Sequence, residues 1–402
     1  MRIRILILIF AITIACNTKE EQLLQSGIWR ASLETKDNAE LPFNFEVTKA
    51  GTIKVFNAEE IITVDEITIK EDSIIIRMPV FEGYIAGTIT ENEINGEFIK
   101  PSLDRIVPFT AKHGVSERFL DPMQPSENIS GKWESYFSPN SDEDRYEALG
   151  IFNQKDNGKV TGTFRTTTGD YRYLEGIMDG DSLKLSAFDG AHAFLFHAKV
   201  DDSIMDGVFY SGNHFKESFV AKRNENYELP DPESLTYLKD GYEKLEFSFP
   251  DENGNTISLS DDRFKNKVVV VQIMGTWCPN CLDETKFYSD FYKKNKDIEF
   301  VALAFEYAKT PEKAFKSIKR LKEKVGIEYP ILLAQYGTSS KTKAQEKLPM
   351  LNHILSYPSS IFIDKKGKVR KIHTGFNGPA TGDKYVTFKK GFENFIEKLR
   401  SE

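Results

Sequence analysis

One stretch of sequence decides the fold of the C-terminal part: Val268-Val269-Val270-Val271-Gln272-Ile273-Met274-Gly275-Thr276-Trp277-Cys278-Pro279-Asn280-Cys281. It begins with a nearly continuous apolar run, as in a buried strand, and ends on two cysteines separated by two residues. This order predicts a strand-to-helix junction, where helix N-terminal amides and the helix dipole stabilise a thiolate. The second sulfur then lies one helical turn away, close enough to resolve a mixed disulfide. The motif indicates dithiol–disulfide exchange.

The composition of the chain is that of an ordinary globular protein. It has 402 residues, 40% hydrophobic and 28% charged, which leaves room for two or three domains. The net charge of −8 and the lack of a basic run argue against a nucleic-acid partner. With 30 Phe and 16 Tyr but only 3 Cys, packing and not disulfide bonding is expected to build the cores.

The N-terminus has the pattern of a targeting segment. Arg2 and Arg4 precede an apolar run, residues 5–14, that is too short to span a bilayer. Thr13-Ile14-Ala15-Cys16 resembles a bacterial lipobox. That resemblance implies a signal peptide over 1–15, a lipid on Cys16, a tether over 16–26, and a chain anchored in the cell envelope facing the periplasm. The alternative is an ordinary secretory signal.

Two stretches, 27–113 and 131–223, show short alternating runs separated by turn residues, which is typical of antiparallel β modules. They look like copies of one another, since Gly27-Ile28-Trp29 matches Gly131-Lys132-Trp133. We expect about eight short strands in each, forming a small barrel or sandwich. The Gly-x-Trp opening and a basic residue on the closing strand resemble lipocalin-like and avidin-like barrels.

From residue 245 to 402 the pattern changes to strands that alternate with longer amphipathic runs, which indicates an α/β class. The predicted strands are 268–274, 298–304, 329–333, 359–363 and 368–372, and the predicted helices are 278–295, 311–325, 343–351 and 387–399. A short helix is also expected over 233–244. The sequence therefore predicts a multidomain chain in which two all-β modules precede an α/β domain.

The Cys-x-x-Cys motif in this setting is a thioredoxin-like signature. Residues 245–402 more closely resemble the TlpA/ResA-type thiol–disulfide oxidoreductases. The resemblance rests on the entry hairpin around Phe247–Gly254, on Gly275-Thr276-Trp277-Cys278 with Glu284, and on Tyr357-Pro358-Ser359-Ser360. It implies a thioredoxin-like domain with disulfide oxidoreductase activity. The β modules lie outside the resemblance.

The resemblance also implies roles for the residues around the motif. Cys278 is the expected nucleophile, exposed at the helix N-terminus, and Cys281 is the expected buried resolving thiol, so that the two alternate between dithiol and redox disulfide. Glu284 would tune the thiols and relay protons, because a carboxyl with a raised pKa can accept the proton of Cys281. The alternative is a first-turn acid that only complements the helix dipole, as we expect for Asp283.

Pro358 precedes a predicted strand at the place where thioredoxin-like folds carry a cis-proline facing the dithiol. A cis bond there exposes the preceding backbone for pairing with an extended substrate chain. We therefore expect Pro358, its neighbour Tyr357 and Trp277 to contact the substrate. The alternative is a trans-proline that starts an edge strand.

A metal or haem at the cysteines is disfavoured by the sequence. Zinc needs two further ligands, but with Cys16 lipidated no cysteine is spare, and the 6 His are scattered. Covalent haem attachment fails because Leu282 stands where that motif needs His. We therefore expect no cofactor and no metal.

The leading hypothesis is a membrane-tethered, extracytoplasmic reductase of protein disulfides, regenerated by an upstream thiol electron donor. A second hypothesis is a thiol peroxidase of the peroxiredoxin branch, although Thr276 does not stand at the spacing that such a site needs; peroxide consumption would distinguish it. A third is a binding lipoprotein whose β modules hold an apolar ligand or a protein partner, which a cavity lined by Phe and Tyr would support.

Overall fold

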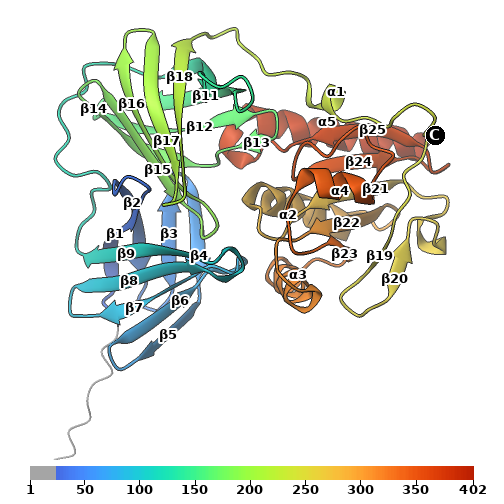
Figure 1. Cartoon of the computed structure of the whole chain (residues 1–402), viewed down its shortest axis with the longest axis horizontal. Helices are drawn as coiled ribbons and strands as arrows, with labels where there is room; N and C mark the ends of the chain where they lie inside the picture. The colour runs from blue at the N-terminus through green and yellow to red at the C-terminus, as the bar shows by residue number, and fades with distance from the viewer. Residues whose placement is uncertain (1–23) are drawn as a thin grey trace, which may run out of the picture.

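A computed structural model describes residues 24–402, so the predicted signal peptide and Cys16 lie outside the described residues. The chain forms three units, drawn in Figure 1 in blue, green and yellow to red. The second β module lies above the first, and the C-terminal domain lies beside both. The predicted class, two antiparallel β modules followed by an α/β domain, is confirmed. No helix among residues 24–402 combines the length and apolarity needed to cross a membrane.

The first module is a single antiparallel sheet of nine strands in the order β4-β3-β2-β1-β9-β8-β7-β6-β5. Its two edge strands are consecutive in the chain, joined only by Asp65, so the sheet must curl until its edges approach one another. The strands are β1 (Gly27–Glu34), β2 (Glu40–Val47), β3 (Ile53–Asn57), β4 (Glu60–Val64), β5 (Glu66–Lys70), β6 (Ser73–Arg77), β7 (Tyr84–Ile89), β8 (Glu93–Lys100) and β9 (Arg105–His113).

The second module is a closed sheet. Its order is β11-β10-β18-β17-β16-β15-β14-β12-β13, and an additional β11–β12 pairing joins the ends into a ring. Closure leaves few free strand edges. The strands are β10 (Gly131–Phe137), β11 (Tyr146–Gln154), β12 (Lys159–Thr166), β13 (Gly169–Asp170), β14 (Leu174–Asp179), β15 (Ser182–Phe188), β16 (Ala193–Asp201), β17 (Ile204–Ser211) and β18 (Phe215–Arg223).

Each module begins with a buried tryptophan in the same setting. The indole of Trp29 donates to the carbonyl of Gln25 at 3.0 Å, and that of Trp133 donates to the carbonyl of Ile129 at 2.9 Å. Both first strands pair with the following strand and with the last strand of their module. The short β13 makes nine strands in the second module, one more than the sequence had suggested, because a two-residue strand leaves no periodic signal.

Aromatic rings fill the interior of the second module. Phe137 is fully buried, and its ring lies 5.0–6.4 Å from six other aromatic rings. These rings belong to Tyr146, Phe164, Tyr171, Phe196, Phe209 and Phe219. Since stacked and edge-to-face pairs add to the burial of apolar area, this cluster stabilises the barrel.

The C-terminal domain has a five-stranded mixed sheet in the order β23-β22-β21-β24-β25, with β21, β22 and β23 parallel and the last two strands antiparallel. A hairpin, β19–β20, precedes it. The elements are α1 (Pro232–Leu235), β19 (Ser248–Pro250), β20 (Thr256–Ser258), β21 (Val269–Met274), α2 (Pro279–Lys294), β22 (Glu299–Phe305), α3 (Pro311–Val325), β23 (Ile331–Gln335), α4 (Lys341–Lys347), β24 (Ser359–Ile363), β25 (Val369–Thr374) and α5 (Asp383–Ser401).

The central strand β21 is buried along its whole length, which explains its apolar sequence. It delivers the chain to the start of α2. This helix packs against α5 through aromatic rings, with Phe287 and Phe392 at 5.1 Å and Tyr288 and Phe392 at 5.3 Å. The start of α2 is therefore held by a buried strand on one side and by a packed helix along its length.

Two predicted helices differ from the structure. The helix expected over 233–244 is only α1, because the chain becomes extended at Thr236 and Leu238 pairs with Leu351. The helix expected over 343–351 is α4, which begins and ends earlier and stops before Leu348, the residue that precedes Pro349. Long-range pairing and proline, not local periodicity, determine both ends.

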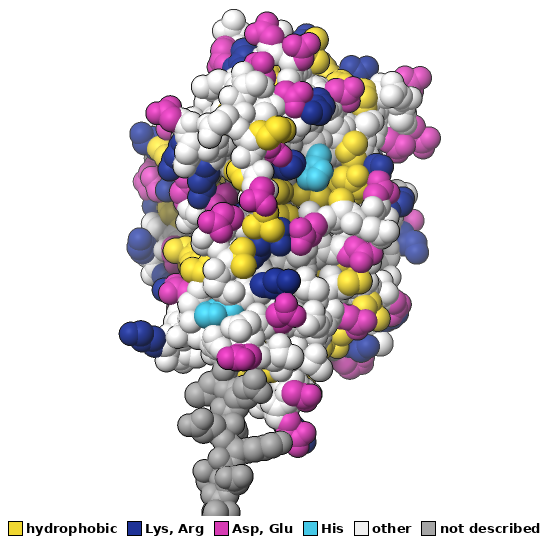
Figure 2. Space-filling model, turned by 90° about the vertical axis from the view of Figure 1, so that its left-hand side faces the viewer, with side chains coloured by type: hydrophobic (Ala, Val, Ile, Leu, Met, Phe, Trp, Pro, Cys, Tyr) yellow, Lys and Arg dark blue, Asp and Glu magenta, His cyan; other side chains and the backbone are white. Residues whose placement is uncertain are grey.

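Acidic and basic side chains are interspersed over the face of the β modules that Figure 2 shows, without an extended region of one sign. The figure agrees with a total of 53 Lys and Arg against 61 Asp and Glu.

The aromatic cluster predicts a large cost for opening the second module. Phe137→Ala is expected to lower its free energy of unfolding by about 3–5 kcal/mol, because a cavity replaces the central ring. Trp133 fluorescence in a Trp29→Phe/Trp277→Phe background would follow this module alone. The control is Phe215→Ala, whose side chain is 42% exposed, with an expected change of under about 1 kcal/mol. Equal effects of the two changes would contradict the role of the cluster.

Candidate active site

The two cysteines lie at the start of α2. Cys278 is the residue that caps the helix, and its sulfur accepts the backbone N–H of Cys281 at 3.3 Å. Pro279 occupies the first turn, where its missing N–H leaves no donor unsatisfied. Both cysteines are free thiols. A backbone amide of the first helical turn therefore contacts the sulfur of Cys278 directly.

Cys278 is more covered than the sequence suggested. We expected an exposed nucleophile, but Cys278 is only 8% exposed and Cys281 is fully buried. The difference arises because the cover comes from tertiary neighbours, including a segment of the second β module that contacts Asn280. Burial raises the pKa of the Cys281 thiol well above its ordinary value. The two thiols therefore lie in unlike surroundings.

The structure brings Trp277, Tyr357 and Pro358 to the dithiol. The Tyr357–Pro358 peptide bond is cis, as predicted. The thiol of Cys278 donates to the carbonyl of Tyr357 at 3.4 Å, which places the residue before the proline against the sulfur. The rings of Trp277 and Tyr357 meet edge to face at 5.6 Å. The indole of Trp277 also donates to the carbonyl of Phe305 at 3.0 Å, which fixes its orientation.

Glu284 lies on the same helix as Cys281 and is fully buried. Its carboxyl group accepts hydrogen bonds from Gln272 at 2.9 Å, Ser360 at 3.0 Å and Tyr288 at 3.1 Å. Burial raises the pKa of Glu284 to about 7, although these three donors oppose the shift. The surroundings favour a titratable buried group over a solvated first-turn acid.

Glu306 is a buried acid near the site that the sequence analysis missed. Its two carboxylate oxygens accept the N–H and the hydroxyl of Thr276, each at 2.7 Å. Burial raises the pKa of Glu306 to about 7. Because Thr276 is two residues before Cys278, Glu306 fixes the loop that leads to the thiol. No sequence signal marked it, since Glu306 merely follows an apolar strand.

Two other neighbours of the dithiol also went unnoticed. Gln272 donates to Glu284 from within the buried strand β21, and its position as a single polar residue in an apolar run is a signal that could have identified it. Burial lowers the pKa of Lys341, at the start of α4, and the charge of Cys278 opposes this shift. Among residues 24–402 no group of three or more His, Cys, Asp or Glu side chains is arranged to hold a metal ion.

Comparisons with known proteins concern the C-terminal part of the chain. The family model described as Redoxin matches residues 239–387. The thioredoxin-like protein YneN of Bacillus subtilis (strain 168) is 27% identical over 139 residues, which cover 34% of this chain and 73% of that protein. The thiol-disulfide oxidoreductase ResA of Bacillus thuringiensis subsp. konkukian (strain 97-27) is 28% identical over 131 residues, 32% of this chain and 66% of ResA. The chain thus spans about two thirds to three quarters of these relatives.

One solved structure was also matched over part of the chain. The thiol-disulfide oxidoreductase from Bacteroides fragilis NCTC 9343 is 23% identical, and the match covers 37% of this chain and 99% of that one with a TM-score of 0.28.

The raised pKa of Glu284 predicts a pH-dependent cost of burying its charge. The folded state holds this proton more tightly than the unfolded state, so the contribution of Glu284 to stability is fully present below pH 4.5 and is lost as the pH rises through about 7. Relative to Glu284→Gln, the wild-type free energy of unfolding should therefore fall by about 3 kcal/mol across this window. Equilibrium unfolding of both proteins across the pH range measures it, and a constant difference would contradict the assignment.

Proposed function

We propose that the chain reduces disulfides of protein substrates outside the cytoplasm, because its C-terminal domain matches the Redoxin family model and is similar to the thiol-disulfide oxidoreductase ResA. Cys278 and Cys281 are the reacting thiols. The observation that carries the proposal is the sulfur of Cys278 at the start of α2, bonded by the amide of Cys281 and facing the carbonyl before a cis-proline.

The reaction has two exchange steps. The Cys278 thiolate attacks one sulfur of the substrate disulfide, forming a mixed disulfide and releasing the other substrate sulfur as a thiolate. Cys281 then loses its proton and attacks the sulfur of Cys278, which releases the second substrate thiolate and leaves a Cys278–Cys281 disulfide. Two electrons pass to the substrate. An upstream thiol donor returns two electrons and restores the dithiol.

Glu284 serves the second step. Burial raises the pKa of Cys281, so this thiol needs a base before it can attack. Glu284 is one helical turn further along α2, and its own pKa of about 7 lets it accept a proton near neutral pH. Trp277, Tyr357 and Pro358 form the substrate contacts, with the backbone of Tyr357 available to pair with an extended chain.

Reduction is favoured over oxidation by the surroundings of Cys281. Dedicated oxidants owe their high potential to a strongly stabilised reduced form. In this chain the burial of Cys281 disfavours its thiolate. Cys281 consequently adds no thiolate stabilisation to the reduced form, which supports a role as an electron donor to substrate disulfides.

The extracytoplasmic location rests on the N-terminal pattern. Thr13-Ile14-Ala15-Cys16 supports cleavage before Cys16 and a lipid on that residue. The aromatic filling of the second module supports a spacer or positioning role for it more than a ligand cavity.

A trapping experiment tests the exchange chemistry. In Cys281→Ala the mixed disulfide cannot be resolved, so protein partners should accumulate on Cys278 and disappear on treatment with dithiothreitol, while turnover is nearly abolished. Electrophoresis without reductant and mass spectrometry measure the adducts. The control is Cys278→Ser/Cys281→Ala, which should trap nothing. Adducts in the control, or none in either variant together with unchanged turnover, would exclude the proposed pair.

The anchor is tested separately. Cys16→Ser should move the protein from the membrane fraction to the soluble extracytoplasmic fraction, because no acyl chains can be attached. Fractionation with immunoblotting and labelling with radioactive palmitate measure this. Unlabelled wild-type protein would refute the lipid anchor and leave the thiol chemistry unaffected.

A further inference from the structure

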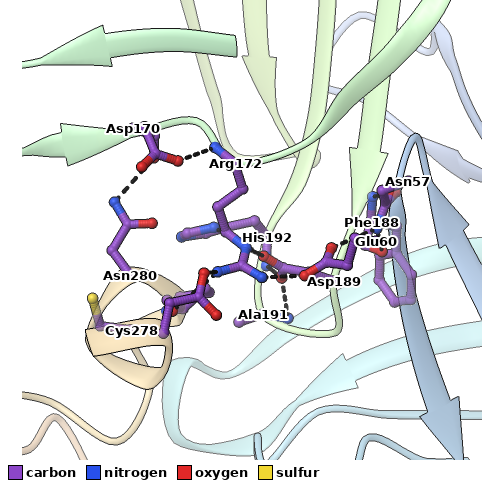
Figure 3. A network of polar contacts seen from close by, with 12 residues as sticks. Asn57, Glu60, Asp170, Arg172, Phe188, Asp189, Ala191, His192, Cys278 and Asn280 are labelled. Atoms are coloured by element: carbon purple, nitrogen blue, oxygen red, sulfur yellow. Dashed lines mark hydrogen bonds and ion pairs between the residues drawn. The ribbon is translucent and has the colours of Figure 1, made fainter. Parts of the chain in front are cut away.

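A turn of the second β module reaches across to the dithiol. It consists of residues 166–170, which connect β12 to β13 and include β13 itself; we call it the β12–β13 turn. The hydroxyl of Ser356 donates to the carbonyl of Thr168 at 2.6 Å. The side-chain amide of Asn280 donates to the carbonyl of Asp170 at 3.0 Å. Figure 3 shows Asp170 and Asn280 meeting directly beside Cys278.

These contacts involve two separate segments of the C-terminal domain. Asn280 stands between the two cysteines, and Ser356 directly precedes Tyr357, whose carbonyl accepts the thiol of Cys278. The end of β25 provides a further contact, because a Cβ built at Gly375 would lie 2.9 Å from the carbonyl carbon of Thr168. The turn therefore touches the segments that surround the nucleophile, which fits the 8% exposure of Cys278.

The turn is anchored at its base by polar groups of both units. The carboxylate of Asp170 accepts the N–H of Gly378 at 2.7 Å, and Arg165 donates to the side chain of Asn377 at 2.9 Å. The backbone of Arg172 donates to the other oxygen of Asp170 at 2.7 Å. The cover is thus held by specific bonds and not by contact alone.

Arg172 extends this anchor to all three units. Its buried guanidinium pairs with Glu60 of the first module, with Asp189 of the second at 3.3 Å, and with Asp283 on α2, and it also donates to the carbonyl of Pro279 at 3.2 Å. Figure 3 shows Arg172 between the second module and α2. Because buried ion pairs of this kind fix orientation, the module is held in register with the helix that carries the dithiol.

We propose that the β12–β13 turn is the specificity-determining element of the dithiol site, a cover that must move aside before a protein disulfide reaches Cys278. The inference rests on the proposed function for its substrate class. The hydroxyl of Ser356, two residues before the cis-proline, already donates its hydrogen bond to the carbonyl of Thr168. A polypeptide that approaches this backbone must displace the turn, whereas a small disulfide needs only the narrow access that remains.

The test is a variant whose added side chain pushes the β12–β13 turn away from Asn280. Gly169 has φ +148°, and a Cβ there would lie 2.3 Å from the amide nitrogen of Asn280, so Gly169→Ala should loosen the turn. The matched control is Gly51→Ala in the first module, where φ is +76° and a Cβ meets nothing within 4 Å. Both changes impose backbone strain, but only the first alters the cover.

Gly169→Ala is expected to speed the alkylation of Cys278 by iodoacetamide about five-fold, the factor that corresponds to the loss of one ordinary hydrogen bond from the closed state. Reduction of insulin should rise by a similar factor and that of the small disulfide DTNB by less. Gly51→Ala should match wild type in all three rates. Ser356→Ala, which removes only the bond to Thr168, should shift the rates in the same direction as Gly169→Ala and provides the measurement if Gly169→Ala does not fold.

An unchanged alkylation rate in Gly169→Ala and Ser356→Ala would overturn the proposal that the β12–β13 turn covers Cys278. Faster alkylation with equal gains for insulin and DTNB would overturn the specificity role, because thiol reactivity and not access would have changed. The alkylation rate measures the access of iodoacetamide to Cys278 and does not depend on catalytic turnover. A wild-type protein that reduces neither substrate would therefore count against the proposed function and leave the test of the cover intact.

Discussion

The amide of Cys281 donates to the sulfur of Cys278, and this one hydrogen bond depends on where helix α2 begins. A buried strand ends at Met274, four residues that end on Cys278 follow, and the helix starts at Pro279. The strand β21 is buried along its whole length, and this packing holds the start of the helix in place. The amide that contacts the sulfur belongs to the helix backbone, so it reorganises little during the reaction.

The loop before the nucleophile is fixed by groups that do not react. Glu306 holds Thr276 by both carboxylate oxygens, and the carbonyl of Phe305 holds the indole of Trp277. Behind the helix, Gln272 and Ser360 bind Glu284. Two acids with raised pKa values therefore flank the dithiol, one oriented toward the loop and one on the helix. Each is buried and hydrogen-bonded, the condition under which a carboxyl group can change protonation near neutral pH.

Much of the fold and part of the site could be predicted from the sequence. Local patterns sufficed for β21, α2 and α3, because apolar runs and caps act over a few residues. Cys278, Cys281, Glu284 and Pro358 were marked by motif spacing and by family resemblance. The cover on Cys278 and the partners of Asp283 could not be foreseen: Arg172 is 111 residues from Asp283, and Asp170 is 110 residues from Asn280. No periodicity encodes a contact between separate units.

The proposed function requires that Cys278 and Cys281 form and break a disulfide reversibly. The most direct measurement is a redox titration of the full chain in glutathione buffers, with the state of each cysteine read by mass spectrometry of the alkylated peptides. We predict a two-electron transition in which a Cys278–Cys281 disulfide forms, with a midpoint more reducing than about −200 mV. Absence of that linkage, or a midpoint near the value of about −120 mV that is typical of a dedicated oxidant, would contradict the account.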